Sequence, residues 1–207
     1  MKLDREDLTP EPLALFDRWY ADAERLGEPE AMTLATLGDD GAPDARTVLM
    51  RGIDRRPGRE GFIFYTNYLS AKGRGLEAHP DCALLFYWGN LLGQSPFGGR
   101  QVRIRGRAEK VEQALSDAYF AKRPLLSQVG AWASPQSEVI EDGVLEEEVA
   151  RGLDFYDEAI VPRPPYWGGY CVVVRTIEFW QSRSGRLHDR FRYSRDGAGW
   201  RVDRLAP

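Results

Sequence analysis

Basic residues alternate with apolar residues near the C-terminus in a pattern that could hold an anion. If residues 186–192 form a strand, successive side chains point to opposite faces. One face would then carry Arg186, His188, Arg190 and Arg192, and the other Leu187, Phe191 and, further on, Tyr193. Because the chain has a formal net charge of -4, this alignment of three guanidiniums favours an anionic ligand opposite them. An edge strand protected by charge explains the same pattern without a ligand.

A second group of donors surrounds the expected start of a helix near residue 70. Tyr65 and Thr66 end an expected strand, and Lys72 lies in the first helical turn. A hydroxyl, backbone amides and an ammonium near a helix N-terminus form a workable phosphate seat. Ordinary helix capping accounts for these residues equally well.

An arginine stands at each end of the segment Arg46-Thr47-Val48-Leu49-Met50-Arg51. Their odd separation places the two guanidiniums on opposite faces of a strand. They cannot share one single-face site unless the strand bends. One arginine on each face is also common in a half-buried strand.

Three further patterns carry donors. The first is a row of alternating polar residues, Gln101, Arg103, Arg105 and Arg107, which a solvated sheet face also explains. The second is a spacing of four residues, in which Tyr119, Arg123 and Ser127 could gather a phenol, a guanidinium and a hydroxyl around one anion. Pro124 interrupts the helix between them, and an ordinary helix end at the surface is the alternative explanation. The third is Gln136 with Ser137, a polar loop or helix start without chemistry of its own.

Hydrophobic periodicity predicts a β-rich chain with separate helices. We expect helices over residues 11–26, with Thr9 and Pro10 at its start, and over 70–78, 111–122 and 143–156. We expect strands over residues 32–37, 44–53, 61–66, 82–87 and 100–110, and three closing strands between residues 167 and 205. This order indicates an antiparallel, closed or nearly closed barrel with helices packed outside, rather than alternating βαβ units.

Composition excludes several function classes. With 207 residues, 43% hydrophobic and 29% charged, the chain fits one globular domain and has no apolar run long enough for a membrane span. Two histidines and the separated Cys82 and Cys171 do not supply a zinc site, so we expect no metal. The charged N-terminus lacks a secretory signal, and we expect a cytoplasmic protein that binds neither nucleic acid nor membrane.

In order along the chain, seven motifs resemble the flavin-dependent pyridoxamine 5'-phosphate oxidase family. They are Arg46-Thr47-Val48-Leu49-Met50-Arg51, Phe64-Tyr65-Thr66-Asn67, Ser127-Gln128-Val129-Gly130-Ala131-Trp132, Trp167-Gly168-Gly169, Ile177-Glu178-Phe179-Trp180-Gln181, Arg186-Leu187-His188-Asp189-Arg190-Phe191 and Asp203-Arg204-Leu205-Ala206-Pro207. The similarity extends from about residue 7 to residue 207.

The resemblance implies a single FMN-binding split-barrel domain over residues 1–207. Residues 1–28 would form a helical arm, and residues 161–207 the strands that close the barrel and make a homodimer with FMN at its interface. The implied FMN contacts are Arg46, Thr47, Val48, Leu49, Met50, Arg51, Tyr65, Thr66, Lys72, Gln101, Gln136, Ser137, Trp180 and Arg190. Arg51, Tyr119, Arg123 and Ser127 would hold the substrate phosphate, while Arg186 and His188 would lie against the pyridine ring as the catalytic pair.

The implied reaction is the oxidation of pyridoxamine or pyridoxine 5'-phosphate to pyridoxal 5'-phosphate by O2, with release of H2O2. His188 would position and hydrogen-bond the substrate rather than serve as an obligate base. The alternatives are a flavin oxidase of the phenazine-biosynthesis type and a carrier of flavin or B6 vitamer without turnover. Tyr119, Arg123 and Ser127 favour a phosphorylated substrate.

Three departures from the family pattern affect these expectations. Arg51 replaces the usual lysine, and Ala71 replaces an arginine, for which Arg74 could compensate. The glycine-rich segment over residues 89–99 is longer than the usual turn by about seven residues, and it is expected to be a flexible loop near the flavin edge.

Overall fold

The computed structural model describes residues 2–89, 91, 98–156 and 160–207. Nine strands form one antiparallel sheet in the order β2-β1-β5-β6-β7-β4-β3, and β8 and β9 extend it from β7. The strands are β1 (Ala31–Leu37), β2 (Pro43–Leu49), β3 (Gly52–Asp54), β4 (Gly61–Asn67), β5 (Asp81–Trp88), β6 (Arg100–Lys110), β7 (Trp167–Gln181), β8 (Asp189–Asp196) and β9 (Gly199–Arg204). The predicted antiparallel barrel architecture with peripheral helices is confirmed.

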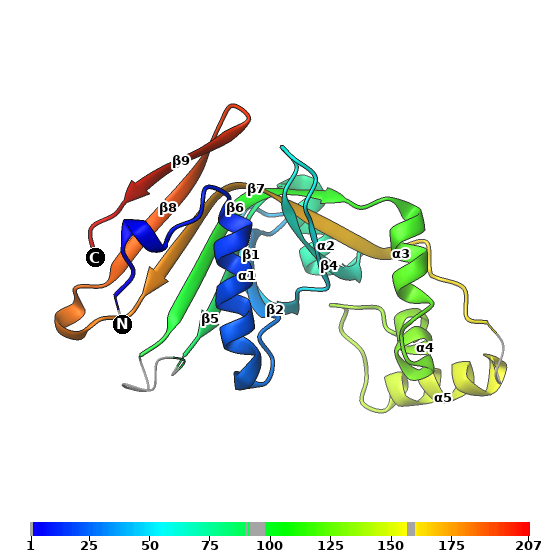
Figure 1. Ribbon diagram of the computed structural model, residues 1–207. Helices are drawn as coiled ribbons and strands as arrows, with labels where there is room; N and C mark the ends of the chain where they lie inside the picture. The colour runs from blue at the N-terminus through cyan, green and yellow to red at the C-terminus, as the bar shows by residue number, and fades with distance from the viewer. Residues whose placement is uncertain (1, 90, 92–97, 157–159) are drawn as a thin grey trace.

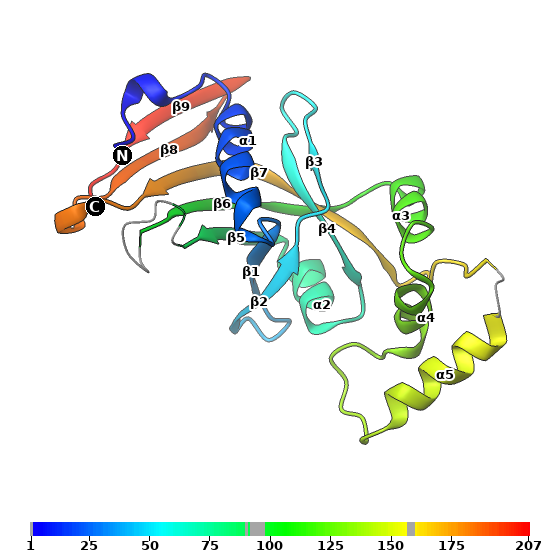
Figure 2. The same ribbon diagram turned by 60° about the horizontal axis from the view of Figure 1, so that its bottom comes forward.

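Helices cover the sheet and one of its ends. They are α1 (Pro12–Ala23), α2 (Ala71–Ala78), α3 (Gln113–Phe120), α4 (Leu125–Ala133) and α5 (Val144–Tyr156), with short 3-10 helices η1 (Arg5–Asp7), η2 (Glu24–Leu26) and η3 (Ser184–Arg186). Figure 1 shows α1 lying across the sheet, and Figure 2 shows α3, α4 and α5 grouped at the end opposite β8 and β9. No helix among the described residues is long and apolar enough to cross a membrane.

The amphipathic helix α1 builds the main core. Pro12 occupies its first turn and Glu11 caps it, so the predicted start at Thr9 and Pro10 is wrong by two residues. Phe16, which is fully buried, contacts the rings of Phe62 and Phe86 at centroid distances of 4.8 and 5.2 Å. These edge-on contacts fix the helix on the inner sheet face.

Alternation along β6 separates the two sheet faces. Val102 and Ile104 are buried in the core, whereas Arg103 and Arg105 are exposed on the opposite face. The predicted bounds of this strand are confirmed, because its period-two pattern is uninterrupted.

Three predictions of local structure were wrong. The strand expected over residues 44–53 is two strands, since Met50 and Arg51 leave the β2 ladder and donate their backbone N–H groups to Glu30 and Ile63. Helix α4 was not predicted. Strand β8 begins at Asp189, so Arg186 and His188 precede it. Most of the glycine-rich segment lies outside the described residues.

A positive backbone angle explains the late start of β8. Gly185 and Arg186 both have left-handed backbones, with φ of 66° and 59°. Two such residues turn the chain instead of extending it. Leu187 therefore does not share the buried strand face of Phe191 and Tyr193, and it is 63% exposed.

Candidate functional site

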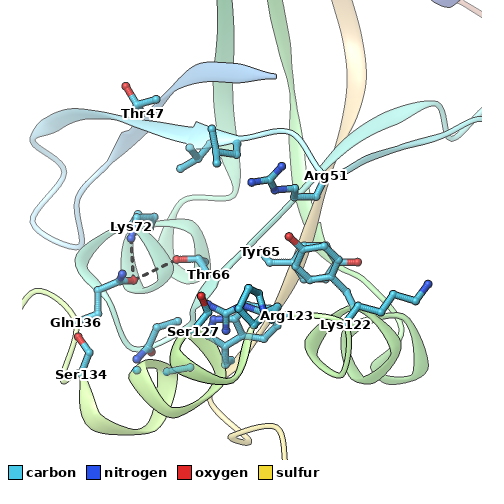
Figure 3. A pocket seen from close by; sticks show the side chains of 18 residues that line it. Thr47, Arg51, Tyr65, Thr66, Lys72, Lys122, Arg123, Ser127, Ser134 and Gln136 are labelled. Atoms are coloured by element: carbon cyan, nitrogen blue, oxygen red, sulfur yellow. Dashed lines mark hydrogen bonds between the residues drawn. The ribbon is translucent and has the colours of Figure 1, made fainter. Parts of the chain in front are cut away.

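A cavity of about 780 Å³ opens between the β2 and β4 strands, α2, and the helices α3 and α4. Its lining comprises Thr47, Val48, Leu49, Arg51, Tyr65, Thr66, Asn67, Lys72, Tyr119, Lys122, Arg123, Pro124, Ser127, Gly130, Ala131, Ser134, Gln136 and Trp167. This lining contains four basic side chains and no Asp or Glu. Figure 3 shows Lys72, Thr66 and Gln136 at one end of the cavity and Lys122 at the other, with Arg51 between them.

Lys72 is held at the start of α2 by neutral groups. Its Nζ donates to Gln136 Oε1 at 3.0 Å and to Ser70 Oγ at 3.3 Å, and Thr66 Oγ1 donates to the same Gln136 oxygen. Burial lowers the pKa of Lys72 below its usual value, and the charge of Arg46 lowers it further. An anion at this helix start would relieve both penalties.

Arg123 is a desolvated cation at another part of the cavity wall. Its guanidinium lies over the Trp167 ring at 4.5 Å and within 5.5 Å of the Phe120 ring centroid. Its Nη1 atom is buried and has no hydrogen-bond partner among the described residues. Burial lowers the pKa of Arg123 below the usual arginine value. A buried, unsatisfied donor of this kind is suited to an anionic ligand.

The predicted spacing of four does gather its three members. Tyr119 lies in the last turn of α3, Arg123 in the link between the helices, and Ser127 in the first turn of α4, and all three line the cavity. Pro124 does not separate them, because it caps α4 and starts a new helix in a new direction.

Four of the six residues of the segment 46–51 line the cavity, and they do not follow the alternation of a single strand because β2 ends at Leu49. Thr47, Val48, Leu49 and Arg51 line the cavity, and Arg51 has Glu30 as a carboxylate partner at 3.4 Å. Arg46 does not line it, because its Nη1 donates to Leu34 O at 3.0 Å and to Thr36 Oγ1 at 2.8 Å. The side chain of Met50 is buried in the core.

Five predicted site residues lie elsewhere. Gln101, Trp180 and Arg190 are direct neighbours across β6, β7 and β8, and we call them the strand row. The His188 ring lies 4.6 Å from the Trp180 ring, next to the turn that carries Arg186. None of these five lines the cavity, and Figure 1 shows β8 and α4 at opposite ends of the molecule.

A carboxylate that sequence reasoning gave no role organises the strand row. Glu178 is 3% exposed, and its Oε1 accepts from Arg190 Nε at 2.8 Å and Nη2 at 2.7 Å. Its Oε2 accepts from Arg103, and Arg192 is paired with Asp203. Arg190 and Arg192 therefore face carboxylates of the chain itself, so the alignment of these two arginines does not by itself favour a ligand.

The departures from the family pattern are clear at the start of α2. The Ala71 N–H donates to Ser137 Oγ at 3.2 Å, and Ser137, a predicted FMN contact, is not among the residues that line the cavity. Arg74 is engaged by Asp39, Glu138 and the Leu69 carbonyl. It is thus not free to replace an arginine at position 71, so the suggested compensation is not supported.

Comparison with known proteins agrees with this architecture. The family described as pyridoxamine 5'-phosphate oxidase matches residues 21–152, and the pyridoxine 5'-phosphate oxidase C-terminal dimerisation region matches residues 167–207. Proteins called pyridoxine/pyridoxamine 5'-phosphate oxidase from Burkholderia multivorans and Burkholderia ambifaria are each 52% identical, over 99% of this chain and 93% of theirs.

Solved structures give the same fold. PhzG from Burkholderia lata, in complex with tetrahydrophenazine-1-carboxylic acid, is 34% identical with a TM-score of 0.86, over 99% of this chain and 98% of that one. An FMN-binding protein related to pyridoxamine 5'-phosphate oxidase, from Nostoc punctiforme, has a TM-score of 0.72 at 16% identity, over 97% of this chain and 100% of its own.

The sheet, the helices and the cationic cavity define an FMN-binding split-barrel flavoprotein. Within that class, the chain belongs to the pyridoxamine 5'-phosphate oxidase family, whose oxidases use FMN. The residues present fit this cofactor. The cavity offers Lys72 and other donors to a phosphate, and its lining contains no carboxylate to repel one.

Proposed function

We propose that this protein oxidises pyridoxamine 5'-phosphate and pyridoxine 5'-phosphate to pyridoxal 5'-phosphate, with O2 as electron acceptor. The products are H2O2 and, from the amine, ammonia. The observation that carries the proposal is the wall formed by Tyr119, Arg123 and Ser127. A phosphate of about -1.5 to -2 charge would complete the hydrogen bonding of the Arg123 guanidinium.

The proposal includes a site shared between two copies of the chain. One copy would supply the cavity, with Arg51, Tyr65, Thr66, Lys72 and Gln136 toward FMN. The second would supply the strand row, together with Arg186 and His188. The match to a dimerisation region over residues 167–207 supports this division, because that region contains Trp180, Arg186, His188 and Arg190.

The chain's own task is to bind and orient. When bound, FMN supplies the acceptor for a hydride from the substrate carbon C4'. His188 accepts a hydrogen bond at Nδ1 from the Arg183 N–H, at 3.2 Å. A neutral ring held in this way carries its hydrogen on Nε2, which would donate to the substrate. Arg186, in a fixed turn two residues earlier, would lie against the pyridine ring.

A second candidate is a flavin oxidase of the phenazine-biosynthesis type. The observation in its favour is the similarity to PhzG, with a TM-score of 0.86 over nearly the whole of both chains. The Arg123 wall favours the phosphorylated substrate instead. The third candidate is a carrier that binds flavin or vitamer without turnover. Alanine in place of arginine at position 71 is the observation that suggests it.

The visible spectrum of the purified protein tests all three readings. We expect flavin bands that bleach when pyridoxine 5'-phosphate is added without oxygen and that return, with H2O2, when air is admitted. Bound flavin that does not bleach would reject the proposed substrate, and bleaching by a reduced phenazine precursor would then support the second candidate. A protein that takes up no FMN would contradict the family's cofactor here.

Complementation tests the shared site. Arg123→Met and Arg186→Ala would each disable both sites of a homodimer, the first from the cavity and the second from the strand side. A heterodimer of the two variants would contain one site with neither substitution. We expect co-expressed, doubly tagged heterodimers to recover about half of the activity, whereas a site within one chain would give no recovery.

A further inference from the structure

The motif Trp167-Gly168-Gly169 has no role in the proposed chemistry, yet it forms part of the cavity. It opens β7 and pairs with β4, so that Trp167 faces Asn67 in the ladder and Gly169 faces Tyr65. The Trp167 side chain is only 6% exposed. The Trp167 carbonyl accepts from Arg163 Nη1 at 2.5 Å, which fixes the backbone at this point.

The two glycines allow aromatic side chains to approach the strand closely. A Cβ atom at Gly169 would lie 2.8 Å from the Tyr65 ring, and one at Gly168 would lie 2.2 Å from the Tyr68 hydroxyl. Real Cβ atoms do not make such contacts, so larger residues would displace the rings. Tyr65 can therefore lie 10° from parallel to Trp167, at a centroid distance of 5.6 Å.

Trp167 and its neighbours form a parallel stack. Tyr119 lies 4.0 Å from Tyr65 with an interplanar angle of 7°, and 6.2 Å from Trp167 with an angle of 4°. Trp167 thus contacts Tyr65, Tyr119 and Arg123, three residues on which the proposed function depends. It also packs edge-on against Phe120, which anchors it in the smaller core beneath α3 and α4.

Arg123 depends on aromatic faces for its position. Among the described residues no carboxylate pairs with its guanidinium, and its buried Nη1 has no hydrogen-bond partner. A long, rotatable side chain without such partners loses its orientation unless packing restrains it. The Trp167 ring, at 4.5 Å, is the nearer of the two rings that do so, since the Phe120 ring centroid lies 5.5 Å away.

We infer that Trp167 is a positioning residue, whose indole face holds the Arg123 guanidinium and the Tyr119 ring ready to receive the substrate phosphate. The inference rests on the proposed function for the identity of the substrate. It does not depend on that function for the presence of an anion site, because Arg123 is unpaired in the wall of a cavity whose lining holds four basic side chains and no carboxylate.

Two substitutions at Trp167 and one matched control test this role in the FMN-loaded protein. Trp167→Leu removes the aromatic face, and Trp167→Phe keeps a smaller one. Trp19→Leu is the control, since Trp19 is 3% exposed and carries Arg100 at 4.6 Å in a similar cation–π contact outside the cavity. Arg100, unlike Arg123, is also held by Asp22 and Gln181.

The first readout is the binding of inorganic phosphate to each holoprotein by titration calorimetry. We expect Trp167→Leu to weaken phosphate binding by roughly 5- to 30-fold, Trp167→Phe by about 2- to 5-fold, and Trp19→Leu not at all. With pyridoxine 5'-phosphate as substrate, Trp167→Leu should raise KM by a similar factor and leave kcat within about 2-fold.

A double-mutant cycle separates positioning from general stability. If Trp167 acts through Arg123, then Trp167→Leu should weaken phosphate binding little further when Arg123→Met is already present. Equal weakening in both backgrounds would overturn the inference, as would unchanged phosphate binding in Trp167→Leu. If that variant does not fold, phosphate affinity of Trp167→Phe equal to wild type decides against the role.

The two proposals fail in different ways. Phosphate binding that depends on Trp167, in a protein that does not oxidise pyridoxine 5'-phosphate, would keep the positioning role and reject the proposed substrate. Oxidation of that substrate with no dependence of KM or phosphate affinity on Trp167 would do the reverse.

Discussion

The basic residues of the cavity and those beside the strand row differ in what faces them. Among the described residues, Lys72 has only neutral hydrogen-bond partners and Arg123 is paired with no carboxylate. By contrast, Arg190 shares Glu178 with Arg103, and Arg192 has Asp203. In sequence, Arg190 and Arg192 alternate with apolar residues, whereas Arg123 stands between Lys122 and Pro124 in a link between helices.

This difference indicates which arginines are suited to bind an anionic ligand. A paired guanidinium has most of its charge compensated within the chain, and its partner fixes its direction. An unpaired and partly buried guanidinium keeps a desolvation penalty that an incoming phosphate removes. The number of positive charges along a strand therefore overstates how strongly the C-terminal arginines favour a ligand. It also gives no indication of the cavity.

The largest expected effect comes from removing the unpaired cation. Arg123→Met should lower kcat/KM for pyridoxine 5'-phosphate by roughly 30- to 150-fold, the value of a charge-assisted hydrogen bond. The free energy of unfolding should stay equal or rise, because a desolvated charge without a partner is lost. Steady-state kinetics and urea denaturation measure both quantities.

Arg195→Met supplies the matched control for a paired arginine. Arg195 is paired with the Glu60 carboxylate, although its Nη1 is buried without a hydrogen-bond partner, and it stacks on Trp200 at 3.8 Å, outside the cavity. This variant should lose stability and keep its kcat/KM. A stability loss in Arg123→Met as large as that in Arg195→Met would contradict the distinction between the two regions.

The next effect should be one of stability, at Glu178. Glu178→Gln replaces the carboxylate between Arg103 and Arg190 with an amide. The NH2 group of that amide would face the N–H donors of one arginine and could not accept a hydrogen bond from it. Because Glu178 is buried while Arg103 is half-exposed, we expect a loss of about 2 kcal/mol, below that of a fully buried pair. Chemical denaturation measures it, and a loss within error of zero would reject the structural role of this pairing.

A smaller effect should appear in the pH dependence of FMN binding. The charged form of Lys72 pairs with a phosphate, and its pKa in the protein without ligand is lowered by burial. As pH rises through this lowered pKa the charge is lost, so FMN affinity should fall at a lower pH than an ordinary lysine would give. Fluorescence titration of the apoprotein at several pH values measures this.

Two variants sharpen that result. Lys72→Arg keeps its charge at all these pH values and should abolish the decline, while Lys72→Met should bind FMN about 10-fold more weakly at neutral pH. Lys110→Met is the control, since Lys110 pairs with Glu77 outside the cavity. A decline of the same size in Lys72→Arg would assign the pH dependence to another group.

Local pattern predicted most of the fold and part of the site. The strand β6 and the helix α5 were predicted nearly to the residue, because alternation and periodicity are local signals. The gathering of Tyr119, Arg123 and Ser127 was also open to sequence reasoning, since their spacing brings them to one side. The helix α4 was missed because only Val129 in it is buried, so its periodicity is weak.

Contacts between residues far apart in the chain could not be predicted from the sequence. Glu178 stood in a quoted motif, but its partner Arg103 is 75 residues away and gives no local signal. The strand expected to contain Arg186 fails because two successive left-handed residues end the extended pattern, and a non-glycine residue rarely adopts that conformation. The inferred role of Trp167 likewise depends on Arg123, which lies in the link between α3 and α4, far from Trp167 in the sequence.

The smallest expected effect is at Ala71, and it tests whether one more cation at the cavity would strengthen FMN binding. Ala71 is the first residue of α2, where family members usually have arginine, and Arg74 is occupied by Asp39 and Glu138. Ala71→Arg should tighten FMN binding by roughly 3- to 5-fold through one added charge-assisted contact. It should also lower apoprotein stability by less than about 1 kcal/mol, because a cation opposes the helix dipole at this end.

Ala71→Gln adds similar bulk and donors without charge, so it isolates the electrostatic part. Tightening by arginine alone would mean that the unpaired charge of the cavity is still insufficient for the FMN phosphate. Equal tightening by both variants would assign the gain to hydrogen bonding. If neither variant tightens binding, Lys72, held by Ser70 and Gln136, already supplies the charge that the FMN phosphate needs, and an arginine at position 71 is not required.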